Sequence, residues 1–286
     1  MKSQTVPGVQ EDAERLAALA LIEDGPRDLT TEVAITRPIE AAAGIEFRTP
    51  GVLAGTVYAE AVAAACEIGI RWDLGEGSRI DRRAIAGSLT GDLARMLRAE
   101  RPLLNLLQRA SGIATMTRNF VDAVAGTSCR VLHTRKTAPG LRIFDLNAVL
   151  AGGGVLHRID LAATVMFKDN HWAALAREGR TLTEAVRSAR SRKAAAVYVE
   201  VESLEQLRQA VAAGADRLLI DNQTPEMVGQ WTRSARDGKP GIEIEATGGI
   251  TLENARAYAL AGADFISIGA LTHSVVAADI SLEINS

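Results

Sequence analysis

Three cationic side chains stand within eight positions of the segment VLHTRKTAPGLRIF, residues 131–144: Arg135, Lys136 and Arg142. An arginine guanidinium binds a carboxylate or a phosphate through two parallel hydrogen bonds, and a lysine adds a compact positive charge. The whole chain carries a formal net charge of −3, which argues against nucleic-acid binding because that requires a broad basic surface. The segment therefore indicates a local site for a small anion, although on its own it also fits a solvated loop.

Charged residues and glycines stand at the ends of a series of short, strand-like runs along the chain. Each of six runs from residue 127 onward is hydrophobic or alternating and rich in Val and Ile, as a parallel strand packed under helices requires. The residues at their ends are Arg135 and Lys136, then Lys168, Glu200, Asp221, Gly248 and Gly249, and finally Gly269 and Ala270. Between the first two runs, the glycine run AGGGVLHR contains His157 and Arg158. Because barrel enzymes carry their active sites at the carboxyl ends of the strands, we expect these residues to share one rim.

The chemistry of this set points to a polyanionic substrate. Several guanidinium groups around one cavity imply a ligand with more than one acidic group. The glycine turns ATGGI and SIGAL offer backbone N–H groups to a phosphate. Glu200 and Asp221 suit ribose hydroxyls or a Mg²⁺ ion that bridges phosphates.

Each residue also has a simpler interpretation. His157 equally fits a buried core histidine, and Glu202 fits an exposed acid in the first turn of a helix. Lys168 alone fits the Schiff-base lysine of an aldolase at the end of a barrel strand. Only the joint placement of these residues favours an active site for anions.

The elements that position the site alternate as strand and helix, which predicts an α/β fold with a parallel sheet that is either closed into a barrel or open. The chemically active residues at the end of every strand favour the barrel. Ser203, Thr224 and Thr251 are expected to begin helices, and Gly214 and Gly262 to end them. The first 110 or so residues contain short β-like pieces with glycine turns and predict a small α+β domain. A long helical region over residues 94–126 is expected to join the two domains.

The bulk composition fits this organisation. The 286 residues are 47% hydrophobic and 23% charged, which is typical of a folded α/β protein. No apolar run approaches the roughly 20 residues of a membrane helix, and the N-terminus lacks a signal-peptide core, so we expect no membrane partner and a cytoplasmic location. Cys66 and Cys129 lie in apolar contexts and are expected to be buried, reduced thiols.

The chain resembles the quinolinate phosphoribosyltransferase family, the nicotinate-nucleotide pyrophosphorylases (carboxylating), over nearly its full length. The segments that carry the resemblance are EDGPRDLTTE, AERPLLNLLQRASGIATMTR, HTRKTAPGLR, AGGGVLHR, FKDNH, VEVESLEQL, IDN, EATGGI and SIGALTHS. The resemblance implies an incomplete parallel α/β barrel (TIM-like) over residues 113–274 and an N-terminal α/β sandwich domain over residues 1–112, with the tail 275–286 packed back on it. It implies a homodimer or a dimer-based hexamer with shared active sites.

The same resemblance implies the conversion of quinolinate and phosphoribosyl pyrophosphate, with Mg²⁺, to nicotinate mononucleotide, pyrophosphate and CO₂ in NAD biosynthesis. The implied dicarboxylate pocket consists of Arg101 from the neighbouring subunit, Arg135, Lys136, His157, Arg158 and Lys168. Glu200 and Asp221 match the acids near the ribose and the metal, and Gly248, Gly249, Gly269 and Ala270 match the 5′-phosphate turns. Lys136, Glu200 and Asp221 are the expected catalytic residues, and no general base is assigned.

Several positions depart from the family pattern and keep different functions open. Leu146, Leu156, Tyr198 and Asp160 stand where the family usually has a lysine, an asparagine, an acid and a glycine. A phosphoribosyltransferase-like family associated with molybdate-transport genes shares TRKT and the glycine run, but FKDNH and GALTHS favour the quinolinate enzyme. The residues also permit ribosylation of a different aromatic acid, a non-catalytic anion-binding protein or a Schiff-base aldolase.

Overall fold

A computed structural model describes residues 4–285, and the chain forms two compact units. One unit, here called the sandwich unit, contains the residues up to Arg118, Lys136–Gly154 and the residues from Ala270 onward. The second, here called the barrel unit, contains Asn119–Arg135 and Val155–Gly269. Each unit is therefore assembled from segments that are distant in the sequence.

The barrel unit is built on six parallel strands. They are β6 (Arg130–Leu132), β7 (Thr164–Phe167), β8 (Ala196–Val201), β9 (Arg217–Asp221), β10 (Glu243–Thr247) and β11 (Phe265–Ser267), in the spatial order β6-β11-β10-β9-β8-β7. Val155 adds one parallel bridge to Leu132 beside β6. All six runs that the sequence predicted as strands are present, and the sheet with its helices confirms the expected incomplete parallel α/β barrel.

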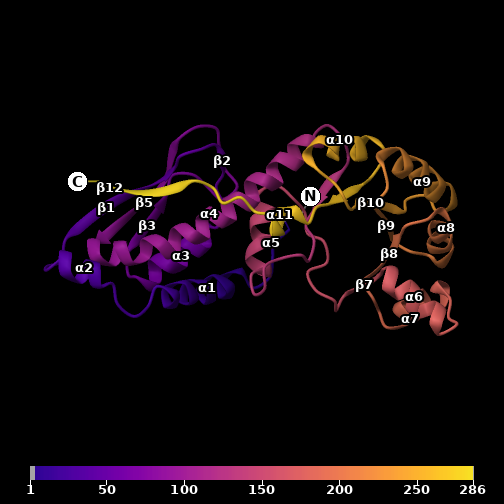
Figure 1. Ribbon diagram of the computed structural model, residues 1–286, viewed down its shortest axis with the longest axis horizontal. Coiled ribbons are helices and arrows are strands. Elements are labelled where there is room, and N and C mark those ends of the chain that lie inside the picture. The colour runs from indigo at the N-terminus through magenta and orange to yellow at the C-terminus, as the bar shows by residue number, and fades with distance from the viewer. Residues whose placement is uncertain (1–3, 286) are drawn as a thin grey trace. The chain divides into compact units, whose positions relative to one another are not determined.

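Helices connect these strands and lie on the outside of the sheet. They are α6 (Asp169–Arg177), α7 (Leu182–Ser191), α8 (Leu204–Ala213), α9 (Pro225–Gly238) and α10 (Leu252–Leu260), and Figure 1 shows α8 and α9 outside β8, β9 and β10. The side chains of Ser203 and Thr224 accept hydrogen bonds from the first turns of α8 and α9. Gly214 ends α8 at a φ of 87°, where glycine has no steric penalty.

The two faces of the barrel sheet have opposite character, because alternate side chains point to opposite faces. The face under the helices consists of aliphatic residues that are completely buried: Val199, Val201, Leu218, Ile220, Ile244 and Ala246. The inner face is largely polar. Strand register places one row of side chains across it, namely Arg130, Phe265, Glu245, Leu219 and Glu200. A second row ends at Thr247 and Asp221.

The sandwich unit contains a four-stranded antiparallel sheet in the order β12-β1-β5-β3 and a two-stranded ribbon. The sheet strands are β1 (Glu40–Phe47), β3 (Gly69–Trp72), β5 (Ala84–Asp92) and β12 (Ile280–Asn285), and the ribbon pairs β2 (Gly51–Val52) with β4 (Arg79–Ile80). The C-terminal strand β12 pairs with β1 from Phe47↔Ile280 to Ala42↔Asn285. This pairing brings the end of the chain back onto its first sheet (Figure 1).

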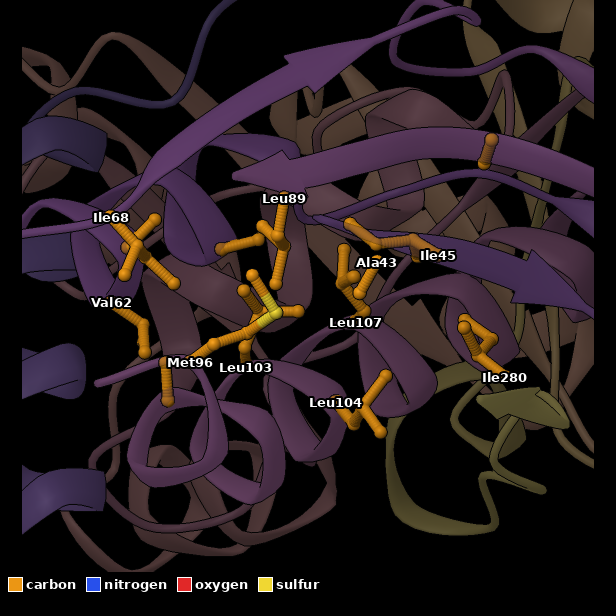
Figure 2. Packing of buried hydrophobic residues seen from close by; sticks show 14 of the residues in the cluster. Ala43, Ile45, Val62, Ile68, Leu89, Met96, Leu103, Leu104, Leu107 and Ile280 are labelled. Carbon is orange, nitrogen blue, oxygen red and sulfur yellow. The ribbon is translucent and has the colours of Figure 1, made fainter. Parts of the chain in front are cut away.

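The helices of this unit are α1 (Val9–Glu23), α2 (Leu29–Ala34), α3 (Thr56–Ala65), α5 (Arg142–Ala151), α11 (Ala270–His273) and the part of α4 (Leu93–Ala123) that precedes Asn119. Of these, α1, α3 and α4 supply buried residues to the core of the sheet. Figure 2 shows Met96, Leu103 and Leu107 of α4 packed against Ile45 and Leu89 of the sheet. Burying such side chains stabilises the fold by about 1.5–3 kcal/mol each.

The segment Lys136–Gly154 lies in the sandwich unit, although the sequence placed it in the barrel domain. The reason is the packing of α5. The ring of Phe144 meets that of Tyr58 edge to face with centroids 4.7 Å apart, and the buried carboxylate of Asp145 accepts hydrogen bonds from Arg109 at 3.0 and 3.1 Å. Leu146 is completely buried, so this departure from the family pattern is a core residue.

The expected boundary at residue 112 falls within α4, which is one continuous helix. Both cysteines are free and buried, as the sequence predicted. Within residues 4–285, no helix combines the length and the apolar character needed to cross a membrane.

Candidate active site

The carboxyl ends of the barrel strands bring together most of the residues that the sequence singled out. Lys168 follows β7 directly, Glu200 lies near the end of β8, and Asp221 is the last residue of β9. Gly248 and Gly249 follow β10, and Arg135 lies three residues beyond β6. Gly269 follows β11 by two positions. One end of the barrel unit therefore carries cations, acids and glycine turns.

Lys168 and Glu200 form an ion pair between the ends of neighbouring strands. Glu200 is 9% exposed and Lys168 is 41% exposed. The end of β8 is held by Trp172, whose indole N–H donates to the carbonyl oxygen of Glu200 at 3.0 Å. Burial raises the pKa of the Glu200 carboxyl, and the Lys168 ammonium opposes this increase. In this pair a half-exposed ammonium contacts a buried carboxylate.

Arg135 and Arg158 form the most cationic part of the site. Burial lowers the pKa of the Arg158 guanidinium, and the like charge of Arg135 lowers it further. The Nη1 atom of Arg158 donates to the carbonyl oxygen of Thr164 at 3.4 Å, and the Nε atom of Arg135 is buried and has no hydrogen-bond partner in the described part of the chain. Among residues 4–285, neither guanidinium has a carboxylate within ion-pair distance. Two neighbouring cations without a carboxylate in direct ion-pair contact favour an anionic ligand.

His157 lies below this rim, with both ring nitrogens in hydrogen bonds. Its Nε2 atom is 3.1 Å from Oε2 of Glu245, and its Nδ1 atom accepts the backbone N–H of Arg158 at 2.6 Å. The side chain is 7% exposed. Both ring nitrogens therefore have partners within the protein, and the contact between His157 and a substrate that the family resemblance implies stays a prediction.

The turn after β10 passes close to Asn222. Gly248 has a φ of 82°, and a Cβ atom there would lie 2.2 Å from Oδ1 of Asn222. Gly249 has a φ of 61° and open space where its Cβ would stand. Thr251 and Asn254 form a capping box at the start of α10. A glycine turn that leads into a helix N-terminus is a suitable site for a phosphate group.

Asp221 stands beside this turn. Its carboxylate accepts a hydrogen bond from the side-chain amide of Asn222 at 2.8 Å, and the backbone N–H of Asn222 donates to Thr247. Glu200 and Asp221 lie on the same face of the sheet, because Glu200 pairs with Leu219 and Asp221 follows two positions later. Both acids thus face the inside of the barrel.

Four residues that the sequence singled out belong to the sandwich unit: Arg101, Lys136, Arg142 and Ala270. Arg101 lies on α4, its side chain 58% exposed, with Glu100 3.9 Å away. The carbonyl oxygen of Lys136 accepts a hydrogen bond from Thr272 at 2.9 Å, and Ala270 begins α11. Arg142 begins α5, and its Nε atom is buried and finds no hydrogen-bond partner among residues 4–285.

Sequence analysis did not identify Glu245 and Arg217, two buried charged residues on the inner face of the barrel sheet. Glu245 is 1% exposed and binds both His157 and Arg217, and the Arg217 guanidinium lies over the ring of Tyr198 at 4.5 Å. The available signal was the alternation of acids in the run IEIEAT, where Glu243 and Glu245 interrupt an otherwise apolar strand.

The fold and the site define an α/β protein with an incomplete parallel barrel, whose strands carry cations, acids and glycine turns at their carboxyl ends. Comparison with known proteins narrows this class. The model of the quinolinate phosphoribosyl transferase N-terminal domain matches residues 28–111, and that of the C-terminal domain matches residues 113–283. The chain belongs to the quinolinate phosphoribosyl transferase family.

Individual relatives support this assignment along the whole chain. The probable nicotinate-nucleotide pyrophosphorylase [carboxylating] of Bacillus subtilis is 38% identical over 268 residues, covering 92% of this chain and 90% of that protein. The rat nicotinate-nucleotide pyrophosphorylase [carboxylating] is 36% identical, covering 94% and 91%. The solved structure of nicotinate-nucleotide pyrophosphorylase from Francisella tularensis superposes with a TM-score of 0.90 at 33% identity, covering 96% of this chain and 97% of that one.

Proposed function

We propose that the protein converts quinolinate and phosphoribosyl pyrophosphate to nicotinate mononucleotide, pyrophosphate and CO₂, a step of NAD biosynthesis. The family assignment supports this reaction. The observation that carries it furthest is the joint placement of Arg135, Arg158 and Lys168 beside Glu200 and Asp221 at one end of the barrel unit.

The cations supply the recognition of quinolinate. Its two adjacent carboxylates match the neighbouring guanidinium groups of Arg135 and Arg158, with the Lys168 ammonium close to the same rim. Each charge-assisted hydrogen bond contributes about 1.5–3 kcal/mol. Lys136, and Arg101 from a neighbouring subunit, complete the proposed pocket.

The glycine turns and the acids receive the second substrate. The N–H groups of Gly248 and Gly249, at the start of α10, are proposed to bind the 5′-phosphate, together with the turn at Gly269 and Ala270. Glu200 and Asp221 are proposed to contact the ribose hydroxyls and the metal–pyrophosphate group.

The acids present fit Mg²⁺ as a companion of the phosphates. Within residues 4–285, no three His, Cys, Asp or Glu side chains converge on one point. Mg²⁺ is commonly held by one or two carboxylates with phosphate oxygens and water, and Glu200 and Asp221 are the carboxylates that would hold it. A bound Mg²⁺ would supply charge neutralisation to the leaving pyrophosphate.

The proposed chemistry relies on placement and charge. The ring nitrogen of quinolinate attacks the anomeric carbon of the ribose as the bond to pyrophosphate breaks, and the acids stabilise the positive charge that develops on the sugar. The resulting pyridinium ring accepts the electron pair of the breaking C–C bond, so the adjacent carboxylate leaves as CO₂. This step needs no general base, and a proton then replaces the lost carboxylate.

The rival functions have less support. The relatives reported above carry the name of the quinolinate enzyme, which does not favour the molybdate-associated family. A protein that only binds anions has no use for Glu200 and Asp221. Lys168 is paired with Glu200 and does not lie in the apolar pocket that lowers the pKa of a Schiff-base lysine.

The assembly and the location complete the proposal. We propose a homodimer or a dimer-based hexamer, in which Arg101 of one subunit completes the pocket of its neighbour. The cytoplasm is the proposed location, since both substrates are soluble metabolites.

The test is a direct assay with Mg²⁺, phosphoribosyl pyrophosphate and quinolinate, following nicotinate mononucleotide by chromatography and CO₂ from labelled carboxylate. We expect both products in equal amounts. The Arg158→Ala variant should lose most activity and quinolinate binding, whereas the exposed Arg192→Ala variant should retain both. Absence of product while quinolinate still binds tightly would overturn the catalytic proposal.

A further inference from the structure

We propose that His157 and Glu245 are positioning residues, which act on quinolinate by fixing the backbone of Arg158. This inference rests on the proposed function and assigns a task to Glu245, a residue in the interior of the barrel. Two consecutive backbone N–H groups of this segment donate to imidazole nitrogens. His157 N–H donates to Nε2 of His133 at 3.0 Å, and Arg158 N–H donates to Nδ1 of His157 at 2.6 Å.

The tautomer of His157 follows from the contacts of its ring with Arg158 and Glu245. Because Nδ1 accepts the N–H of Arg158, the ring proton resides on Nε2 and is donated to Oε2 of Glu245 at 3.1 Å. Glu245 must be ionised to act as a pure acceptor. Burial raises the pKa of its carboxyl, but the contacts with His157 and Arg217 outweigh that effect and hold the pKa below its ordinary value.

Glu245 is itself rigidly held. Its carboxylate accepts a hydrogen bond from Arg217 at 3.1 Å, and the Arg217 guanidinium lies between two aromatic rings, 3.9 Å from the centroid of Phe265 and 4.5 Å from that of Tyr198. The ring of Tyr198 also meets His157 edge to face, with centroids 5.5 Å apart. These contacts therefore fix the orientation of the His157 ring before a substrate binds.

The position of this network explains its proposed effect. Glu245 lies in the row of inner-face residues that ends at Glu200, whose charge acts on Arg158. Among the described residues, the Arg158 side chain has one hydrogen bond to protein, the 3.4 Å contact with Thr164. Its backbone is consequently the part that the protein holds firmly, and a bidentate contact with a carboxylate requires that backbone to be correctly placed.

Two variants of His157 separate positioning from direct contact. Asn at position 157 places an amide oxygen near the position of Nδ1 and retains the bond to Arg158. Gln places its amide near Nε2 and retains the bond to Glu245. We expect His157→Gln to raise the KM for quinolinate by about tenfold with an unchanged KM for phosphoribosyl pyrophosphate. We expect His157→Asn to raise it less, by about as much as Glu245→Gln, since both weaken only the bond between His157 and Glu245. A larger effect of His157→Asn than of both His157→Gln and Glu245→Gln would overturn the proposal, since it would show that Nε2 acts on the substrate directly and not through Glu245.

Glu243 offers a matched control for Glu245. Both acids bind Arg217, but Glu243 does so at 2.7 Å from a 43% exposed position and has no contact with His157 among the described residues. Glu245→Gln should raise the KM for quinolinate, whereas Glu243→Gln should not, and thermal unfolding should show both variants folded. Equal effects of the two substitutions would show that the network only stabilises the barrel.

Two further measurements keep this inference distinct from the proposed function. In an Arg158→Ala background, His157→Gln should cause no additional loss of quinolinate binding, because it acts through Arg158. ¹⁵N NMR of the wild-type protein should show His157 protonated on Nε2 and not on Nδ1. If the wild type forms no nicotinate mononucleotide, the proposed function fails; if it does and the double variant shows additive losses, only the positioning role fails.

Discussion

Lys168 and Glu200 form an ion pair across the ends of β7 and β8, in which the carboxylate is buried and the ammonium is half exposed. The pair joins a residue proposed to bind quinolinate to one proposed to contact the ribose. The same ammonium opposes the increase that burial causes in the pKa of Glu200. Substrate recognition and the charge state of Glu200 are therefore coupled.

Replacing Lys168 by Met is expected to remove activity and to destabilise the protein in a pH-dependent manner. A carboxyl whose pKa is raised by folding makes the native state less stable as pH rises through that pKa. Without Lys168 the pKa of Glu200 rises further, so the loss of stability should be about 1–2 kcal/mol near neutral pH and should shrink in acid. Urea unfolding across this range measures it, with the exposed Lys193→Met as the control. A loss that is independent of pH would contradict the coupling.

Gly248 and Gly249 provide a matched pair of substitutions in the proposed phosphate turn. Both have a positive φ, but only at Gly248 would a Cβ collide with a neighbour, Oδ1 of Asn222. Gly248→Ala should therefore raise the KM for phosphoribosyl pyrophosphate strongly, while Gly249→Ala should carry the backbone strain alone, about 1–2 kcal/mol. Steady-state kinetics with each substrate varied in turn distinguishes them. Equal effects would show that the contact with Asn222 does not shape the turn.

Asp145 is expected to make the stability of the sandwich unit depend on pH. Complete burial raises the pKa of its carboxyl from 3.8 to about 6, against the opposing effect of Arg109. Because the pKa is raised by folding, stability is lost as pH rises from about 4 to about 6, by about 3 kcal/mol. The Asp145→Asn variant lacks this dependence, and the exposed Asp81→Asn variant retains it. Urea unfolding of the three proteins between these pH values provides the comparison, and parallel curves for wild type and Asp145→Asn would refute it.

The sequence was sufficient to predict the barrel because its signals are local. Each predicted strand is a short run that ends in polar or glycine residues, and helix caps such as Ser203 and Thr224 act within three positions. The positions of Lys168, Glu200 and Asp221 at strand ends follow directly from this pattern. Residue type and position at a strand end were together sufficient to predict which side chains lie at the carboxyl ends of the barrel strands.

The contacts between distant segments could not be predicted in the same way. The bond between His157 and Glu245 joins residues 88 positions apart, and nothing near His157 indicates that its ring turns toward the barrel interior. The packing of Phe144 against Tyr58 similarly depends on a helix from a distant part of the chain. Tyr198 looked like the loss of an acid, but its ring lies between His157 and Arg217.

A shared active site makes a final prediction about mixtures of two inactive variants. Arg101 is proposed to complete the pocket of a neighbouring subunit, whereas Arg158 acts in its own barrel. Arg101→Ala and Arg158→Ala should each be inactive alone. After subunit exchange, a mixed dimer contains one site that has both arginines, so an equal mixture should recover about a quarter of wild-type activity. Mixing Arg101→Ala with the double variant is the control, because no site then has both arginines. If the first mixture stays as inactive as this control although mixed dimers form, Arg101 does not act across the subunit boundary.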